Sequence, residues 1–306
     1  MINFTSGVFL KNINKISSPS FKGNFRPVSE PESDVFIKQA KKEEIPDYVD
    51  LNEITPELLE SLSNTLHNSG KKDFEKYYNL FDSYFNDTGA KLTGRTKDCS
   101  SILSKLSKRT KILDCSSDPS FSLIERANVA VPDLNGYRLI TSGKPEDVEK
   151  IVTKITDLIF DGKLYPSHFF NYGQVPYLTE EQTDFLSKLG FYHNKDKKPS
   201  GFSCVNMYFY TDEGKKIELQ IMGDKVDKVN DKQHLTYNYK TKGQATENGV
   251  VNKTMQNILD SMDSTSMEKY QEYENECYLY SRLLETGETP NKPKLPNGLD
   301  KRLALL

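Results

Sequence analysis

The chain of 306 residues carries 41 basic and 44 acidic side chains, which gives a formal net charge of −3. This balance argues against binding of nucleic acid through an overall basic surface, so any basic site must be local. No apolar run approaches the roughly 18 residues of a membrane-spanning helix, and the N-terminus lacks the apolar core of a signal peptide. The cysteines form no CxxC pair, which predicts free thiols in a reducing, cytoplasmic compartment. They are Cys99, Cys115, Cys204 and Cys277.

The N-terminal part of the chain predicts a flexible leader followed by two helices. Residues 1–45 are rich in Asn, Ser, Lys and Pro and show no sustained period. Thr55-Pro56-Glu57 combines an N-cap, a first-turn proline and a first-turn acid, which predicts a helix start. A second helix is expected from about Lys72 to Phe85, where aromatic residues at helical spacing indicate core packing.

A strand and a basic helix are expected next. Residues 91–97 predict a short strand on which Arg95 and Lys97 share a face. Asp98 leads into a helix that carries Ser101, Lys105 and Arg109 at i, i+4 and i+8. These side chains line one path, although a solvated basic helix face has the same spacing. Residues 110–130 predict a loop with an uncertain helix.

The middle of the chain predicts a buried strand, an amphipathic helix and a loop. Asp133 precedes the strand, where a carboxylate often holds a metal, and an Asx turn explains it equally well. The helix is expected at 145–160, after Pro145. Residues 163–178 are expected to form a loop, and 179–189 a helix. His168 and His193 flank that helix as loop or surface residues rather than metal ligands.

A hairpin is expected over residues 204–221. Ile217, Leu219 and Ile221 alternate with Glu218 and Gln220, which predicts a half-buried strand. Asp212-Glu213-Gly214 indicates the turn, and pairing Tyr210 with Lys216 sets Tyr208 opposite Glu218 and Asn206 opposite Gln220. The polar face is either the floor of a site or an ordinary solvated surface.

The C-terminal part is expected to be helical. Residues 226–239 predict a helix, 242–252 a linker, 253–287 further helices, and the remainder a tail with three prolines.

The common nucleotide and hydrolase motifs are missing: the sequence has no GxxxxGK[ST], no GxGxxG after a strand, no HExxH and no GxSxG. What remains is a set of dispersed cations, two carboxylates and an aromatic ring after a glycine. Polyphosphate chemistry uses such a set, since cations neutralise phosphates, carboxylates hold magnesium and a ring stacks on a base. The set comprises Arg95, Lys97, Lys105, Arg109, Arg138, Lys198, Asp133, Glu218 and Phe202.

The order of four motifs resembles the synthetase domain of RelA/SpoT-type alarmone synthetases. They are Gly94-Arg95-Thr96-Lys97 with Ser101 and Lys105, then Pro132-Asp133-Leu134-Asn135-Gly136-Tyr137-Arg138, then Lys198-Pro199-Ser200-Gly201-Phe202, then Ile217-Glu218-Leu219-Gln220-Ile221. The resemblance covers about residues 50–242. It implies an α+β fold with a mixed, mainly antiparallel sheet of about five strands flanked by helices, as in nucleotidyltransferases, and leaves extra C-terminal helices. The division that follows is a leader (1–45), a synthetase domain (46–242) and a C-terminal segment (243–306).

The resemblance also implies an activity and its residues. The family transfers the β,γ-pyrophosphate of ATP to the ribose 3′-hydroxyl of GDP or GTP with Mg²⁺. By resemblance, Asp133 and Glu218 hold the metal, and Glu218 also activates the hydroxyl. Residues expected to bind ATP are Arg95, Lys97, Ser101, Lys105 and Arg109, and residues expected on the acceptor side are Lys198, Gly201, Phe202, Asn206 and Gln220.

Departures from the family lie mostly on the acceptor side. Asn206 stands where the family has a histidine, Phe202 where it has tyrosine, and Met222-Gly223 where it has Arg-Thr. These changes leave open another acceptor, either an adenine nucleotide or a tRNA 3′ end as in toxin members of the family. A catalytically inactive nucleotide-binding protein on the same fold and a homo-oligomer also stay open.

Overall fold

The computed structural model describes residues 45–116, 120–195, 201–247 and 250–306, which belong to one compact unit, Glu43–Leu306. The predicted leader lies almost wholly outside the described residues. The α-helices are α1 (Pro56–Phe85), α2 (Cys99–Lys108), α3 (Thr110–Leu113), α4 (Leu123–Ala130), α5 (Pro145–Phe160), α6 (Glu180–Lys188), α7 (Asp224–Lys242), α8 (Lys253–Asp260) and α9 (Ser264–Glu285). The strands are β1 (Lys91–Thr96), β2 (Asn135–Thr141), β3 (Tyr165–Tyr172), β4 (Tyr192–His193), β5 (Cys204–Tyr210), β6 (Lys216–Gly223), β7 (Thr246–Glu247) and β8 (Val250–Val251).

The main sheet has six strands in the order β1-β2-β6-β5-β3-β4. Neighbouring strands pair antiparallel except for β2 with β6 and β3 with β4, which are parallel. The predicted α+β class with a mixed, mainly antiparallel sheet is therefore confirmed. The strand beyond the expected five is the two-residue β4 at the edge.

The central hairpin has the predicted register. Tyr210 pairs with Lys216, Tyr208 with Glu218 and Asn206 with Gln220. Gly214 closes the turn with a φ of +74°, a conformation that costs glycine little because it has no Cβ. The alternation of apolar and polar residues predicted this register, because a slip of one residue would move every apolar side chain to the solvent-facing side of the sheet.

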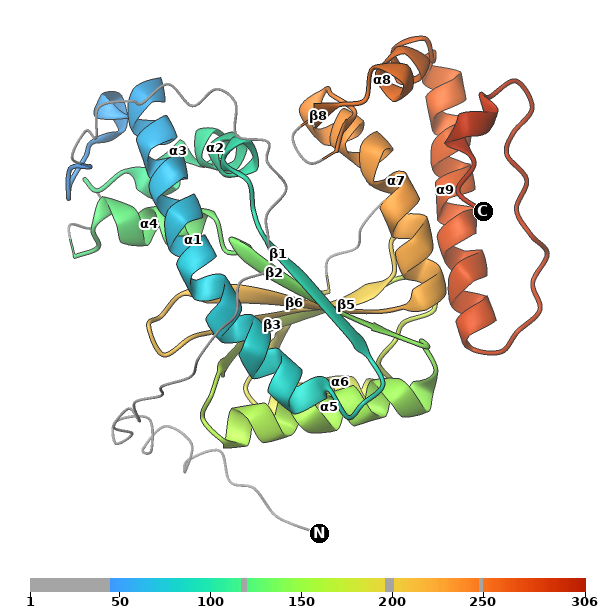
Figure 1. The fold of residues 1–306 in the computed structure, drawn as a ribbon, viewed down its shortest axis with the longest axis horizontal. Coiled ribbons are helices and arrows are strands. Elements are labelled where there is room, and N and C mark those ends of the chain that lie inside the picture. The colour runs from blue at the N-terminus through green and yellow to red at the C-terminus, as the bar shows by residue number, and fades with distance from the viewer. Residues whose placement is uncertain (1–44, 117–119, 196–200, 248–249) are drawn as a thin grey trace, which may run out of the picture. The chain divides into compact units, whose positions relative to one another are not determined.

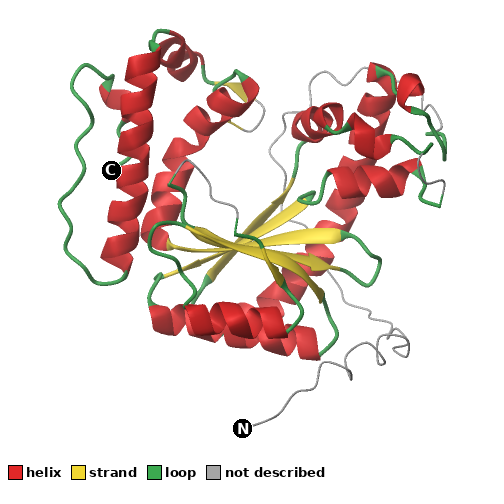
Figure 2. Ribbon diagram, turned by 180° about the vertical axis from the view of Figure 1, so that it is seen from behind, coloured by secondary structure: helices red, strands yellow, loops and turns green. Residues whose placement is uncertain are grey.

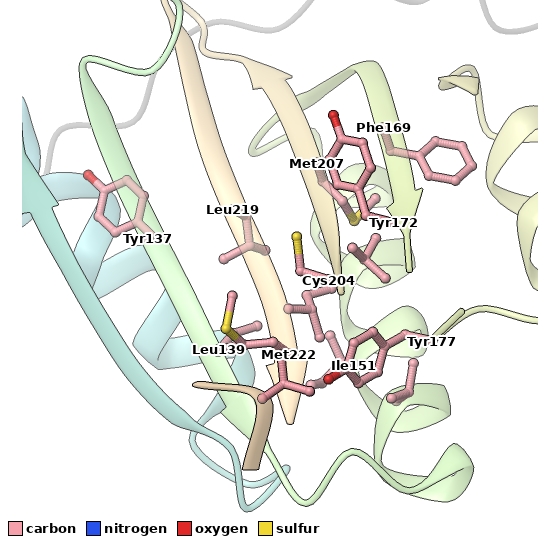
Figure 3. Packing of buried hydrophobic residues seen from close by; sticks show 14 of the residues in the cluster. Tyr137, Leu139, Ile151, Phe169, Tyr172, Tyr177, Cys204, Met207, Leu219 and Met222 are labelled. Carbon is pink, nitrogen blue, oxygen red and sulfur yellow. The ribbon is translucent and has the colours of Figure 1, made fainter. Parts of the chain in front are cut away.

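The two faces of the sheet differ in what covers them. One face packs on α5, α6 and the C-terminal half of α1, and its side chains include Tyr137, Leu219, Met207 and Phe169 (Figures 1 and 3). The other face carries the polar residues of β2, β5 and β6. Helices α2 and α7 lie on this second side, at different ends of the sheet (Figure 2).

Helix α1 corrects the prediction of two separate helices, because it runs without a break through Gly70 for 30 residues. A Cβ on Gly70 would lie 2.8 Å from Thr96 Cγ2, and Asn135 Nδ2 donates to the Gly70 carbonyl at 3.0 Å. Glycine here permits close packing of helix on sheet, which offsets its poor helix propensity.

Strand β3 corrects the prediction of a loop at 163–178, and it places His168 in the sheet, paired with Tyr208. Its outward residues are aromatic rather than polar, so the strand lacks the alternation of hydrophobicity on which the prediction depended. His193 also lies in a strand, β4. The predicted loop at 110–130 contains the short helices α3 and α4.

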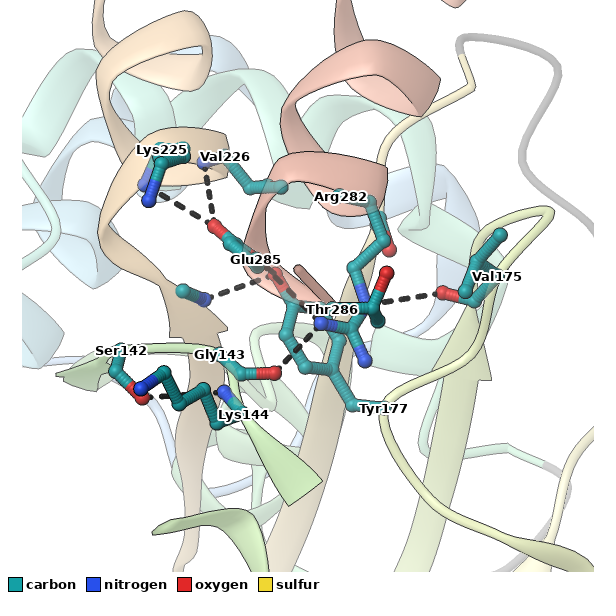
Figure 4. A network of polar contacts seen from close by, with 12 residues as sticks. Ser142, Gly143, Lys144, Val175, Tyr177, Lys225, Val226, Arg282, Glu285 and Thr286 are labelled. Atoms are coloured by element: carbon teal, nitrogen blue, oxygen red, sulfur yellow. Dashed lines mark hydrogen bonds and ion pairs between the residues drawn. The ribbon is translucent and has the colours of Figure 1, made fainter. Parts of the chain in front are cut away.

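The C-terminal helices are anchored to the sheet by a buried polar network (Figure 4). Glu285, at the end of α9, accepts the backbone N–H groups of Lys225 and Val226 at 3.0 and 2.9 Å and the Tyr177 hydroxyl at 2.8 Å. Arg282 donates to the Gly143 carbonyl at 2.6 Å. The carboxylate thus caps the first turn of α7, and the segment 243–306 packs onto the domain predicted for 46–242. The linker expected at 242–252 contains the small β7–β8 hairpin.

Candidate active site

A transverse row of residues crosses the polar face of the sheet. Arg95 of β1 pairs with Gly136 of β2, Gly136 with Glu218 of β6, and Glu218 with Tyr208 of β5. Residues directly opposite one another on neighbouring strands point to the same face. The two ends of the predicted site, which are more than 100 positions apart in sequence, therefore meet in one row of the sheet.

Glu218 is oriented by two hydrogen bonds to the same oxygen. Its Oε1 accepts Asn206 Nδ2 at 2.7 Å and the Tyr208 hydroxyl at 2.8 Å. Burial raises the pKa of Tyr208, and the Glu218 charge raises it further, so this phenol stays protonated as a donor. Oε2 faces Gly136, where a Cβ would lie 3.4 Å away. Glycine at this position keeps Oε2 free of a close contact with a side chain from β2.

Asp133 lies between two lysines. Its Oδ2 is 3.2 Å from Lys97 Nζ and also contacts Lys105 Nζ. Burial opposes ionisation of Asp133, but the two ammonium groups outweigh it and lower the pKa of this carboxyl. Burial lowers the pKa of Lys105, against the attraction of Asp133 and Glu218. An Asx turn would need a backbone N–H donated to this carboxylate, and the described residues show no such hydrogen bond.

Asp133 and Glu218 are the residues expected from the sequence to hold Mg²⁺, and their surroundings allow a test of that expectation. Asp133 Oδ1 is buried and accepts no hydrogen bond within the described part of the chain. A buried oxygen without a partner is costly unless a ligand satisfies it. No group of three or more His, Cys, Asp or Glu residues suited to a metal occurs among the described residues. Mg²⁺ commonly takes one or two carboxylates together with substrate phosphates, which suits Asp133 and Glu218.

Two of the predicted ATP-binding residues contact Asp133, and the others lie in different surroundings. Arg95 is exposed on β1, and Lys97 and Lys105 contact Asp133. Ser101 lies in the first turn of α2, where its hydroxyl donates to the N-cap residue Asp98 at 2.8 Å. Arg109 instead donates to the Ala130 carbonyl at 2.7 Å, at the end of α4. That contact holds α2 and α4 together and gives Arg109 a structural partner.

The predicted acceptor residues lie in two different environments. Gln220 accepts a hydrogen bond from Arg138 Nε at 3.4 Å on the polar face, and Asn206 is only 3% exposed and bonded to Glu218. Gly201 and Phe202 instead pack against α9. The Phe202 ring meets Tyr278 edge-on at 5.8 Å, and a Cβ on Gly201 would lie 2.8 Å from Asn275 Cα.

The acceptor-side roles expected for Lys198 and Phe202 stay predictions. Lys198 lies outside the described residues. Phe202 packs against the core with its ring perpendicular to that of Tyr278, and its stacking on an acceptor base stays a prediction.

The site includes residues that the sequence did not identify. His168 stacks on Tyr208 with ring centroids 4.4 Å apart, which extends the row onto β3. Lys242, the last residue of α7, donates from Nζ to Ser101 Oγ at 3.0 Å. The hairpin register placed Tyr208 beside Glu218 and could have identified its role. No local pattern signals Lys242, because its contact spans 141 positions.

Comparisons with known proteins give no match to a family model and none to a curated protein. Three of the solved structures that are similar are the following. The small alarmone synthetase 1 of Bacillus subtilis, bound to its product pppGpp, is 16% identical, with a TM-score of 0.36 over 72% of this chain and 89% of that chain. A GTP pyrophosphokinase family protein of Streptococcus pneumoniae is 16% identical, with a TM-score of 0.35 over 75% and 98%. A Streptococcus mutans UA159 protein is 12% identical, with a TM-score of 0.36 over 71% and 88%.

No helix within the described ranges is both long enough and apolar enough to cross a bilayer.

Proposed function

We propose that this protein is a Mg²⁺-dependent pyrophosphokinase that transfers the β,γ-pyrophosphate of ATP to the ribose 3′-hydroxyl of a nucleotide, GDP or GTP in the first instance. The observation that carries the proposal is that Arg95 and Glu218 lie in one row of the sheet, and that Lys105, which is paired with Asp133, also interacts electrostatically with Glu218. This arrangement combines cations for a polyphosphate with a separate, oriented carboxylate for the attacking hydroxyl. The four ordered sequence motifs support the same reaction.

In the proposed reaction the acceptor 3′-oxygen attacks the β-phosphorus of ATP. A bond forms between that oxygen and the β-phosphorus, the bond from the β-phosphorus to the α,β-bridging oxygen breaks, and AMP leaves. Glu218 Oε2 takes the hydroxyl proton, while Tyr208 and Asn206 hold the other carboxylate oxygen in place. Arg95, Lys97 and Lys105 neutralise the negative charge of the transferred group.

The proposed metal ion would stabilise negative charge. Asp133 and Glu218 would hold Mg²⁺, which supplies electrostatic stabilisation of the polyphosphate. The protein contributes mainly position and charge, because pyrophosphoryl transfer needs little covalent help.

The test is incubation with γ-labelled ATP, Mg²⁺ and separate acceptors, followed by thin-layer separation of the labelled products. The panel comprises GDP, GTP, ADP, ATP and tRNA. We expect a labelled nucleotide and equimolar AMP, both lost in Glu218→Gln. If no acceptor becomes labelled while the wild-type chain is folded, the proposal is wrong.

A second candidate is the same transfer to an acceptor other than GDP or GTP. It is favoured by Asn206, which replaces the family's histidine and is buried against Glu218, where it presents no positive charge to acceptor phosphates. Label on ADP, ATP or tRNA, with none on guanine nucleotides, would support this second candidate.

A further inference from the structure

The C-terminal end of α7 contacts both ends of α2. Lys242 Nζ donates to Ser101 Oγ at 3.0 Å, and Lys108 Nζ donates to the Thr241 carbonyl at 3.5 Å. Helix α7 begins directly after β6, the strand of Glu218, and so connects the two sides of the candidate site (Figure 1).

Positive charges outnumber negative ones around this contact. Partial burial lowers the pKa of Lys242, and Lys97, Arg95 and Lys108 lower it further, whereas Asp98 opposes them. Lys105 adds another cation next to Asp133. Cations gathered at a partly buried place repel one another, and a bound polyanion would remove that repulsion.

The position of Lys242 depends on α9. Lys240, two residues before it, forms a 2.6 Å ion pair with Glu274 of α9, whose side chain is 0% exposed. The same carboxylate accepts the Thr236 hydroxyl at 2.9 Å. A buried ion pair with further hydrogen bonds fixes the two helices in one relative position. The C-terminal half of α7 is therefore held where Lys242 meets α2.

We propose that Lys242 is an additional ATP-binding residue, which contacts the polyphosphate together with Arg95, Lys97 and Ser101 and exchanges its bond to Ser101 for a phosphate oxygen. This role rests on the proposed function. In this proposal the segment 243–306 contributes to ATP binding, because α9 positions the helix that carries Lys242.

The test compares Lys242→Met with Lys228→Met, which removes an exposed lysine of the same helix that pairs only with Asp224 in the described structure. The affinity for α,β-methylene-ATP with Mg²⁺ is measured by calorimetry on the full chain. A hydrogen bond to a charged group contributes about 1.5–3 kcal/mol, so Lys242→Met should bind roughly 10- to 100-fold more weakly. Lys228→Met should bind like the wild type, and Lys242→Arg should recover most of the affinity.

Two failures can be told apart. Equal affinities of the wild type and Lys242→Met would overturn the role of Lys242 and leave the proposed function standing. A folded wild-type chain that binds no ATP analogue and labels no acceptor would overturn the proposed function, and the role of Lys242 with it. If Lys242→Met does not fold, Lys242→Gln is used, with the same expected loss. Raised KM for ATP at unchanged melting temperature separates binding from a purely structural contribution of Lys242.

Discussion

Tyr208 donates its hydroxyl hydrogen to Glu218 Oε1 at 2.8 Å across the β5–β6 pair. This bond fixes which carboxylate oxygen faces Gly136 and remains available to a substrate. Tyr208→Phe should therefore lower kcat about tenfold, the effect of losing a hydrogen bond to a charged group. The affinity for α,β-methylene-ATP should change less than about twofold, because the lost hydrogen bond orients Glu218, which is proposed to act on the acceptor hydroxyl.

Tyr210→Phe is the control for Tyr208→Phe, because it removes a hydroxyl from the exposed end of the same strand. We expect it to keep wild-type kcat. A Tyr208→Phe variant that loses ATP affinity and keeps kcat would contradict the orienting role.

Asp133→Asn should raise the Mg²⁺ concentration needed for half-maximal activity and lower the maximal rate about 100-fold. The amide keeps the shape of the side chain but removes the charge that the two lysines contact and that would hold the proposed Mg²⁺. Mg²⁺ titration of activity checks this. Asp73→Asn, which alters the ion pair with Lys215, is the control and should leave the Mg²⁺ dependence unchanged.

Gly201→Ala should destabilise the protein more than Gly214→Ala. Both glycines have positive φ, +67° and +74°, so both substitutions carry the cost of a Cβ in the left-handed region, about 1 kcal/mol. Only at Gly201 does the new Cβ also meet another backbone, at Asn275 Cα. Urea unfolding measures the free energy of unfolding of both variants. Equal decreases at the two sites would show that the close contact between Gly201 and α9 does not affect stability.

Glu285→Ala should lower the free energy of unfolding by about 3 kcal/mol or more, since it leaves the buried Arg282 without its carboxylate partner. It also removes the acceptor for the first N–H groups of α7. Glu288→Ala, at an exposed position nearby, should change stability by less than about 0.5 kcal/mol. Thermal and urea unfolding of the two variants test the prediction.

Asp98 should contribute stability that disappears in acid. Burial raises its pKa, but hydrogen bonds from Ser100 and Ser101 outweigh burial and bring the pKa to about 2. A carboxyl with a lowered folded-state pKa stabilises the protein above its unfolded pKa, and this stability is lost as the pH falls through the folded value.

The Asp98→Ala variant tests this. It removes the N-cap of α2 and should lower the free energy of unfolding by about 1 kcal/mol at pH 7. The difference from the wild type should shrink between about pH 4 and pH 2. Urea unfolding at several pH values measures it, with the exposed Asp184→Ala as control. A difference that stays constant down to pH 2 would exclude an ionised cap.

Local patterns predicted the elements whose two faces differ clearly. Strand β6 alternates apolar and polar residues, and α5 combines an amphipathic stripe with a first-turn proline, so both were found with their bounds close to the structure. Strand β3 was missed because Phe169 faces the core while His168 and Phe170 face the site, and the strand is aromatic on both sides.

Contacts between distant segments could not be predicted from the sequence. Arg109 has the spacing of a phosphate-binding residue, yet the end of α4 gives it a structural acceptor. Phe202 follows a glycine in a family motif, yet it packs on α9, which the motif does not include. Lys242 lies in a polar stretch that predicted a linker, and only the fold brings it to Ser101.

The parallel pairing of β2 with β6 affects the order in which the parts of the candidate site form during folding. The β5–β6 hairpin closes a short turn, whereas Gly136 and Glu218 pair across a long intervening chain, and such closure is slow because entropy is lost before contacts form. We expect the hairpin to form early and the β2–β6 ladder late. A kinetic intermediate would then hold Glu218 bonded to Tyr208 but lack Asp133 and Arg95 beside it, so nucleotide binding should appear only with the last folding phase.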